Sequence, residues 1–146
     1  MNTKELSPIC RQVRRDIITM TANAGSGHPG GSLSAVELMT SVFFNHMRVD
    51  PKNPHDPDRD RFVLSKGHAA PCYYAVLAAK GFISRDEYAN FRQLHSILQG
   101  HPDARRSPAW TLPRVLSVRA CPSLSVWRSV PSISARIRRS SPSSRR

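Results

Sequence analysis

The sequence predicts an α/β fold over its first hundred residues, because helical apolar patterns flank one short run typical of a buried strand. That strand is predicted at residues 61–64, RFVL, and it leads through the polar turn SKGH into a helix. Strand, turn and helix in this order form an α/β unit. A change of composition after Asp103 further predicts that the domain occupies residues 1–103 and that residues 104–146 form a separate tail.

The first helix is predicted from apolar residues at steps of three and four, with Pro8 tolerated in its first turn. A glycine-rich loop, GSGHPGGS, follows at residues 25–32. The S-x-x-E pattern of Ser34 and Glu37 is a capping box that opens a second, largely buried helix. The apolar residues are Leu6, Ile9, Val13, Ile17 and Met20 in the first helix, and Val36, Leu38, Met39, Val42 and Phe43 in the second.

Residues 50–60 are rich in Pro, Asp and Asn and predict an exposed loop. An Ala- and Tyr-rich helix is expected at residues 69–80, closed by Gly81. Another S-x-x-E pattern starting at Ser84 predicts a helix to about Leu98, followed by Gly100-His101-Pro102. Three aromatic residues are interpreted as core: Tyr73, Tyr74 and Phe91.

The formal charge of +12 is concentrated in the last 43 residues. Residues 1–103 hold 12 Lys and Arg against 10 Asp and Glu, whereas residues 104–146 hold 10 Arg, 11 Ser, 5 Pro and no acidic residue. This composition predicts a disordered tail with nonspecific affinity for polyanions. The alternative is a non-enzymatic binding module whose basic tail binds nucleic acid.

The cysteines and apolar runs predict a cytoplasmic protein. The 3 cysteines are widely spaced and form no C-x-x-C pair, which argues against a disulfide framework or a zinc site and favours a reducing compartment. Charges interrupt the apolar positions of the N-terminal segment, unlike those of a signal peptide. No run approaches the roughly 18 apolar residues of a membrane span, so no membrane association is expected.

Three histidines lie in or beside glycine-containing turns: His28, His68 and His101. Each has a simpler alternative, which is a water-facing loop residue for His28, a capping residue for His68 and a helix-dipole partner for His101. The other histidines, His46, His55 and His95, lack metal-ligand spacing, and no metal ligand is predicted. The glycine loop also satisfies G-x-G-x-x-G, but a helix precedes it where a dinucleotide site requires a strand.

Taken together, the segments SGHPGGSLSAVELMTSVFF, DRFVLSKGHAAPCYYAVLAAKGFIS and FRQLHSILQGHPD resemble the N-terminal, diphosphate-binding domain of transketolases. The resemblance is collinear from about Arg11 to Asp103. It implies a transferase of carbohydrate metabolism, in the pentose phosphate pathway, that moves a two-carbon ketol unit between sugar phosphates. It also implies thiamine diphosphate, a divalent metal (Mg or Ca), and either a homodimer or a separate C-terminal subunit.

The same resemblance implies a role for each of the three histidines. His28 would be catalytic, contacting substrate and assisting proton transfer, and His101 would hydrogen-bond substrate hydroxyls. His68 would contact the cofactor's diphosphate. Histidine suits such tasks because its ordinary pKa lies close to neutral pH.

The family pattern stops after Asp103, where a TGSLGQGLS-like segment and the later metal-binding residues are expected but absent. A single-nucleotide deletion explains the change, because one DNA string can encode both ARKVPGVDLATGSLGQGLSLSVGVA and, out of frame, residues 106–128. Trp110 and Trp127 make the comparison demanding, since tryptophan has a single codon. We therefore expect a frameshifted transketolase fragment that is inactive alone.

Overall fold

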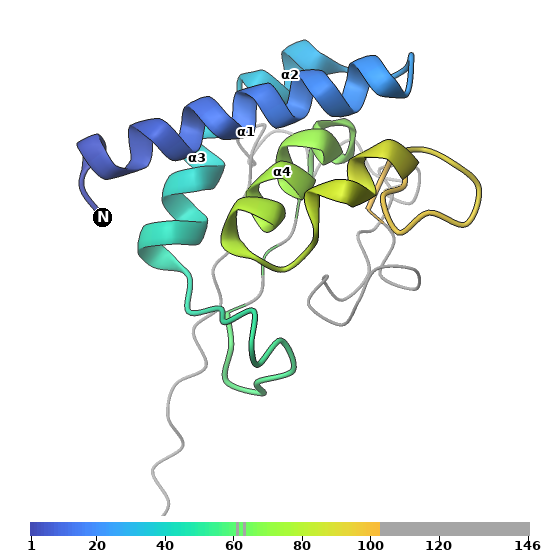
Figure 1. Ribbon diagram of the computed structural model, residues 1–146. Helices are drawn as coiled ribbons and strands as arrows, with labels where there is room; N and C mark the ends of the chain where they lie inside the picture. The colour runs from blue at the N-terminus through green and yellow to red at the C-terminus, as the bar shows by residue number, and fades with distance from the viewer. Residues whose placement is uncertain (61, 63, 103–146) are drawn as a thin grey trace, which may run out of the picture.

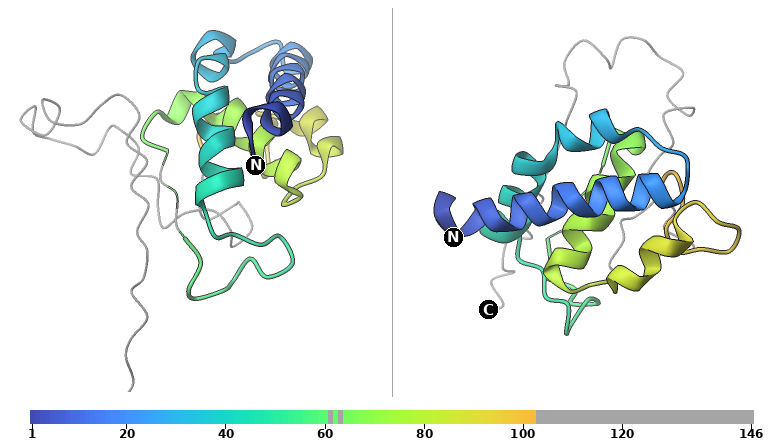
Figure 2. Two further views of the ribbon diagram at one scale, coloured as in Figure 1. Left: turned by 90° about the vertical axis from the view of Figure 1, so that its left-hand side faces the viewer. Right: turned by 45° about the horizontal axis from the view of Figure 1, so that its top comes forward.

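The computed structural model describes residues 1–60, 62 and 64–102, and these form a helical assembly in which α1 lies across α4 (Figures 1 and 2). The strand predicted at residues 61–64 is not confirmed. Phe62 and Leu64 are buried but belong to no strand, and residues 61 and 63 lie outside the described part. Within the described ranges there are helices and no strand, so the α/β class is not confirmed either.

Helix α1 spans Thr3–Asn23 and confirms the first predicted helix. It begins with a capping box that the sequence patterns did not predict: the Asn2 side chain accepts from the Glu5 N–H, and the Glu5 carboxylate accepts from the Asn2 N–H, both at 3.0 Å. Because the helix starts this early, Pro8 lies in its second turn and not in the first, a correction. The C-terminal half of the apolar face, Val13, Ile17 and Met20, is fully buried.

The second predicted helix, which opens at Ser34, is present as two short pieces, α3 at Val36–Ser41 and a π-helical turn, η1, at Val42–His46. A further short helix, α2 at Pro29–Leu33, precedes it. The glycine loop is therefore shorter than predicted, because Pro29 starts α2 within it. The capping box predicted at Ser34 and Glu37 is wrong. The Ser34 hydroxyl donates to the Gly31 carbonyl at 3.1 Å, and Glu37 forms an ion pair with Arg14 of α1.

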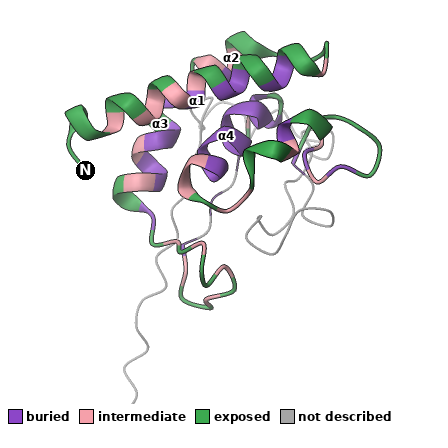
Figure 3. Cartoon of the chain, in the orientation of Figure 1, coloured by how far each residue is buried: buried purple, intermediate pink, exposed green. Residues whose placement is uncertain are grey.

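Helix α4, Ala70–Lys80, is the centre of the fold and confirms the predicted helix. A single 3-10 turn, η2 at Gly67–Ala69, leads into it, and Gly81 ends it with a φ of +94°, which glycine adopts without strain. Residues 70–78 are all buried (Figure 3). Tyr73 and Tyr74 are core residues as predicted, and Tyr74 meets Phe91 edge-on at 6.2 Å between ring centroids.

The helix predicted from Ser84 to about Leu98 is wrong beyond its first turns. A 3-10 helix, η3, spans Arg85–Asn90, and the Ser84 hydroxyl accepts from the Asp86 N–H at 3.2 Å where a capping box would use Glu87. The chain then turns, and Arg92 and His95 have φ values of +64° and +67°, which no helix contains. Leu98 is fully buried at the end of this turn region.

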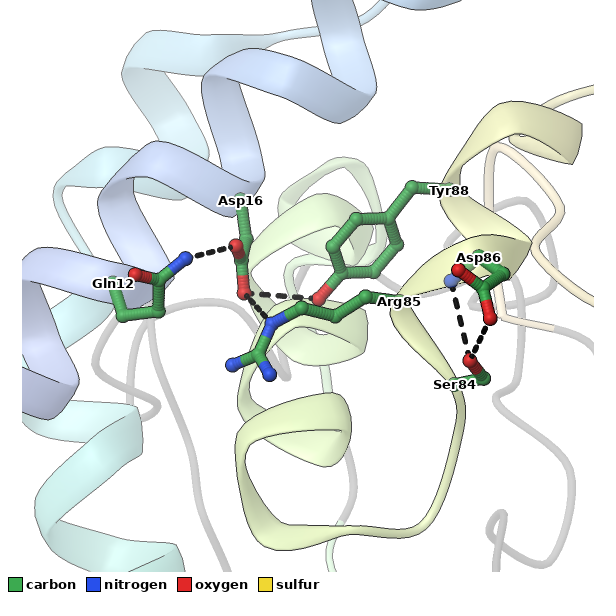
Figure 4. A network of polar contacts seen from close by, with 6 residues as sticks. All are labelled: Gln12, Asp16, Ser84, Arg85, Asp86 and Tyr88. Atoms are coloured by element: carbon green, nitrogen blue, oxygen red, sulfur yellow. Dashed lines mark hydrogen bonds and ion pairs between the residues drawn. The ribbon is translucent and has the colours of Figure 1, made fainter.

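A buried carboxylate fixes η3 against α1 (Figure 4). Asp16 is 4 % exposed and accepts from the Tyr88 hydroxyl and the Arg85 Nε, both at 3.1 Å. Gln12 donates to the other carboxylate oxygen at 2.7 Å. Burial and the neighbouring Asp16 carboxylate together raise the pKa of Tyr88. The longer predicted helix is thus replaced by a short 3-10 helix anchored through polar groups.

The exposed loop predicted at residues 50–60 is present, with turns and no helix. Its end is closed by Asp60, whose carboxylate accepts from the Arg48 N–H at 2.7 Å. No helix in the described residues is both long and apolar enough to cross a membrane. The predictions for residues 104–146, the disordered basic tail and its out-of-frame origin, lie outside the described residues.

Candidate functional site

The fold brings His28 and His68 together, although 40 positions separate them in the sequence. Their ring centroids are 5.7 Å apart, with the rings at 66° to each other. His28 is the residue before α2, and its side chain makes no capping hydrogen bond to that helix. His68 lies in η2, immediately before α4. Both imidazoles are exposed, so each is accessible to a ligand.

A glycine allows the two loops to approach each other. A Cβ on Gly31 would lie 3.1 Å from Cδ2 and 3.2 Å from Nε2 of His68, closer than side chains normally pack. The ammonium of Lys66 donates to the Gly31 carbonyl at 3.1 Å and lies 3.4 Å from the Ser34 hydroxyl. Lys66 therefore connects the turn that carries His68 to the α2 segment that follows His28.

The third histidine approaches from the end of the described chain. A Cβ on Gly67 would lie 2.6 Å from Cδ2 of His101, so His101 is in contact with the backbone next to His68. Residues 99–101 reach this position because the Tyr74 hydroxyl of α4 donates to the Gln99 carbonyl at 2.9 Å. The structure thus gathers the three predicted site residues around η2.

The groups that act on His68 are all basic. Partial burial is the first cause that lowers the pKa of His68 below its ordinary value, followed by Lys66, His28 and His101. A neutral imidazole is favoured while the site is free of anions. An anion bound among these groups would reverse that balance, because it favours the imidazolium form.

His28 is exposed in a loop, so the simpler explanation of a water-facing loop residue fits it, whereas the simpler explanations for His68 and His101 fit the structure poorly. Neither His28 nor His68 caps a helix through its side chain, and the helix whose C-terminus would explain His101 ends at Asn90. His46, His55 and His95 are exposed. Across residues 1–60, 62 and 64–102, no group of three or more His, Cys, Asp or Glu side chains could hold a metal.

Lys66 is a site residue that sequence reasoning missed. The sequence patterns place it only in a polar turn, although it stands two residues before His68 and directly precedes Gly67. A cation beside a histidine in a turn after an apolar run is a signal for anion binding that the sequence contained. The sequence also contains Gly31 in the glycine-rich loop, but its contact with His68 depends on tertiary packing.

His28, Lys66, His68 and His101 form a basic cluster with glycines at its closest approaches. Such a cluster defines a class of site that is suited to an anionic ligand. Residues 5–112 match the family model described as transketolase, thiamine diphosphate binding domain. The chain belongs to this family.

Comparisons with individual proteins agree. The chain is 47 % identical to human (Homo sapiens) transketolase over 97 residues, which cover 66 % of this chain and 16 % of that protein. It is 44 % identical over 89 residues to one subunit of the apulose-4-phosphate transketolase of Phocaeicola vulgatus, covering 61 % of this chain and 32 % of that relative. A transketolase variant from Pichia stipitis in complex with fructose 6-phosphate matches with a TM-score of 0.67 and 35 % identity, covering 74 % of this chain and 16 % of that one.

Proposed function

We propose that residues 1–103 form the diphosphate side of a thiamine diphosphate-dependent transketolase site, which moves a two-carbon ketol unit from a ketose phosphate to an aldose phosphate. The observation that carries this proposal is the convergence of His28, Lys66 and His68 against Gly31, inside the segment that matches the family. The complex of a similar Pichia stipitis transketolase with fructose 6-phosphate supports sugar phosphates as substrates.

The residues of the site fit a diphosphate group. Lys66 and His68 offer N–H donors, and the groups that act electrostatically on His68 are all basic. Donors of this kind form short, charge-assisted hydrogen bonds to phosphate oxygens. His68 would hold the diphosphate of the cofactor, with Lys66 beside it. Thiamine diphosphate, when bound, supplies the carbanion chemistry, and the protein supplies position and proton handling.

His28 lies beside His68, and His101 contacts Gly67 next to it, so both are the candidates for contact with the sugar. An imidazole near neutral pH can donate a proton from one nitrogen and accept one at the other. We assign His28 to substrate contact and proton transfer, as the catalytic histidine, and His101 to hydrogen bonds with substrate hydroxyls. The divalent metal of the family is not assigned to these histidines, because the described residues hold no cluster of suitable ligands.

We further propose that the 146-residue chain has no ketol-transfer activity alone. It spans 16 % of the length of human transketolase, and its sequence lacks the glycine-rich and metal-binding segments that the resemblance leads one to expect. A second copy of a complete chain or a C-terminal subunit would have to supply the remainder of the site. The Phocaeicola vulgatus relative, which is named as one subunit of its enzyme, is consistent with such a division.

Binding of thiamine diphosphate with Mg²⁺ to the 146-residue chain, followed by NMR of the imidazole protons, tests this proposal. We expect saturable binding, a rise of the His68 pKa on binding, and about tenfold weaker binding for His68→Gln, since a charge-assisted hydrogen bond contributes about 1.5–3 kcal/mol. The matched control is His55→Gln, in the exposed loop. No saturable response, or equal losses in both variants, would refute the diphosphate role. Thiamine-dependent turnover by the purified chain would refute the second proposal.

A further inference from the structure

We propose that Tyr74 is the positioning residue that holds His101 against the turn carrying His68. This inference rests on the proposed function, because it treats both imidazoles as parts of one site. Tyr74 lies in α4, six positions after His68, and the two residues belong to one continuous helical run from Gly67 to Lys80. A bond from Tyr74 to the His101 segment therefore links the two histidines through a rigid element.

The Tyr74 side chain is well suited to fix a position. The residue is 0 % exposed, and its ring is packed between Tyr73 and Phe91, at centroid distances of 6.0 and 6.2 Å. Its hydroxyl donates to the Gln99 carbonyl at 2.9 Å, two residues before His101. A buried ring with a directed hydrogen bond limits both the distance and the direction of the attached backbone.

Among the described residues, the other hydrogen bonds of the segment that carries His101 lie mostly within the segment. Residues 91–99 form no helix or strand, and Arg92 and His95 have positive φ. The Arg92 N–H donates to the Leu98 carbonyl at 2.8 Å, and Gln99 donates to the Ser96 carbonyl at 2.6 Å, so these bonds stay within the segment. Leu98 and Pro102 are buried, but apolar contacts of this kind are not directional.

Tyr74 holds His101 in a tightly packed position. His101 lies so close to Gly67 that a Cβ there would be 2.6 Å from its Cδ2. A shift of the Gln99–His101 backbone would open this contact and separate His101 from His68. His101 also contributes to the lowered pKa of His68, so the same shift has a spectroscopic signature.

The test uses the 146-residue chain without ligand, and it compares Tyr74→Phe with Tyr88→Phe. Each substitution removes one hydroxyl that bonds to another segment, but the Tyr88 hydroxyl of η3 donates to Asp16 of α1, away from the histidines. NMR measures the nuclear Overhauser effect between the Gly67 Hα and the His101 Hδ2 protons, together with the titration of His68. Far-UV circular dichroism monitors the helices.

We expect Tyr74→Phe to reduce that Overhauser effect by more than half and to raise the His68 pKa toward its ordinary value, with the helical signal retained. Tyr88→Phe should lower the thermal midpoint and leave both site readouts unchanged. The positioning role would be overturned if Tyr74→Phe kept the wild-type values of both site readouts. Equal losses in both variants, or loss of the helical signal in Tyr74→Phe, would overturn it as well. Because no ligand is present, failure of thiamine diphosphate binding refutes the proposed function without deciding this result.

Discussion

The backbone of Gly67, in η2, lies so close to the His101 ring that a methyl group on its Cα would not fit between them. We expect Gly67→Ala to displace His101, because the new Cβ would lie 2.6 Å from its Cδ2. His101 is exposed and can swing outward, so the loss of stability should stay within about 1 kcal/mol. The measurement is the His101 ring chemical shift, together with a rise of the His68 pKa.

The matched control for this substitution is Gly30→Ala. Gly30 lies in α2, where a Cβ would meet nothing within 4 Å. Equal changes of the His101 signals in the two variants would contradict a specific contact at Gly67.

His68 also makes stability depend on pH. Its pKa is lowered in the folded state, first by burial and then by Lys66, His28 and His101. The unfolded chain therefore binds the proton more readily as the pH falls below the ordinary histidine value of about 6.5. Stability should be fully present above that value and decrease as the pH falls through the folded pKa.

We expect urea unfolding at pH 7, 6 and 5 to show a smaller loss of unfolding free energy for His68→Gln than for wild type. The glutamine keeps a polar side chain but does not titrate. An identical pH dependence in the two proteins would contradict this linkage.

At the scale of elements, Asp16 joins α1 to η3, and its carboxylate accepts hydrogen bonds from Gln12, Arg85 and Tyr88. We expect Asp16→Ala to lower the unfolding free energy by about 1–3 kcal/mol, because it leaves the buried Tyr88 hydroxyl without its partner. Arg85 is half exposed and can be rehydrated, which limits the cost. Chemical denaturation measures the difference.

Asp86→Ala is the control for Asp16→Ala, because Asp86 is an exposed acidic residue of the same η3 segment whose side chain contacts Ser84. Its effect should remain within about 0.5–1 kcal/mol. A larger loss for Asp86→Ala than for Asp16→Ala would show that the surface turn, and not the buried carboxylate, supports η3.

Helices α1 and α4 were predictable because their signals are local: an apolar period of 3.6 residues in α1, and in α4 an apolar run between a polar turn and a terminal glycine. The S-x-x-E patterns at Ser34 and Ser84 are local signals too, but other residues, near or far in the sequence, compete for the same groups. Glu37 pairs with Arg14, and Asp86 takes the Ser84 hydroxyl. A cap pattern is therefore reliable only where no other residue offers its groups a better partner.

At the scale of the whole molecule, the described core runs from Val13 to Leu98, whereas the excess positive charge lies after Asp103. We expect a chain shortened to residues 1–103 to keep the thermal midpoint of the full chain within about 5 °C, the shift that roughly 1 kcal/mol produces in a domain of this size. The shortened chain should lose the salt-dependent binding of duplex DNA that ten arginines favour.

Thermal circular dichroism and fluorescence anisotropy at several salt concentrations check these two outcomes. A fall of the midpoint by more than about 10 °C would show that residues after Asp103 support the core. Sequence-selective DNA binding by the full chain would instead favour the binding-module alternative.

The sequence by itself determined the family resemblance, the two principal helices, the aromatic core and the three histidines, since each depends on residue type and short spacing. Only the tertiary structure decided that these histidines meet, because His28, His68 and His101 come from separate segments that pack around η2. It also added Lys66 and Tyr74, whose roles follow from contacts with Gly31 and Gln99 across 35 and 25 positions of sequence. Local patterns specify elements, whereas the meeting of distant side chains depends on how those elements pack.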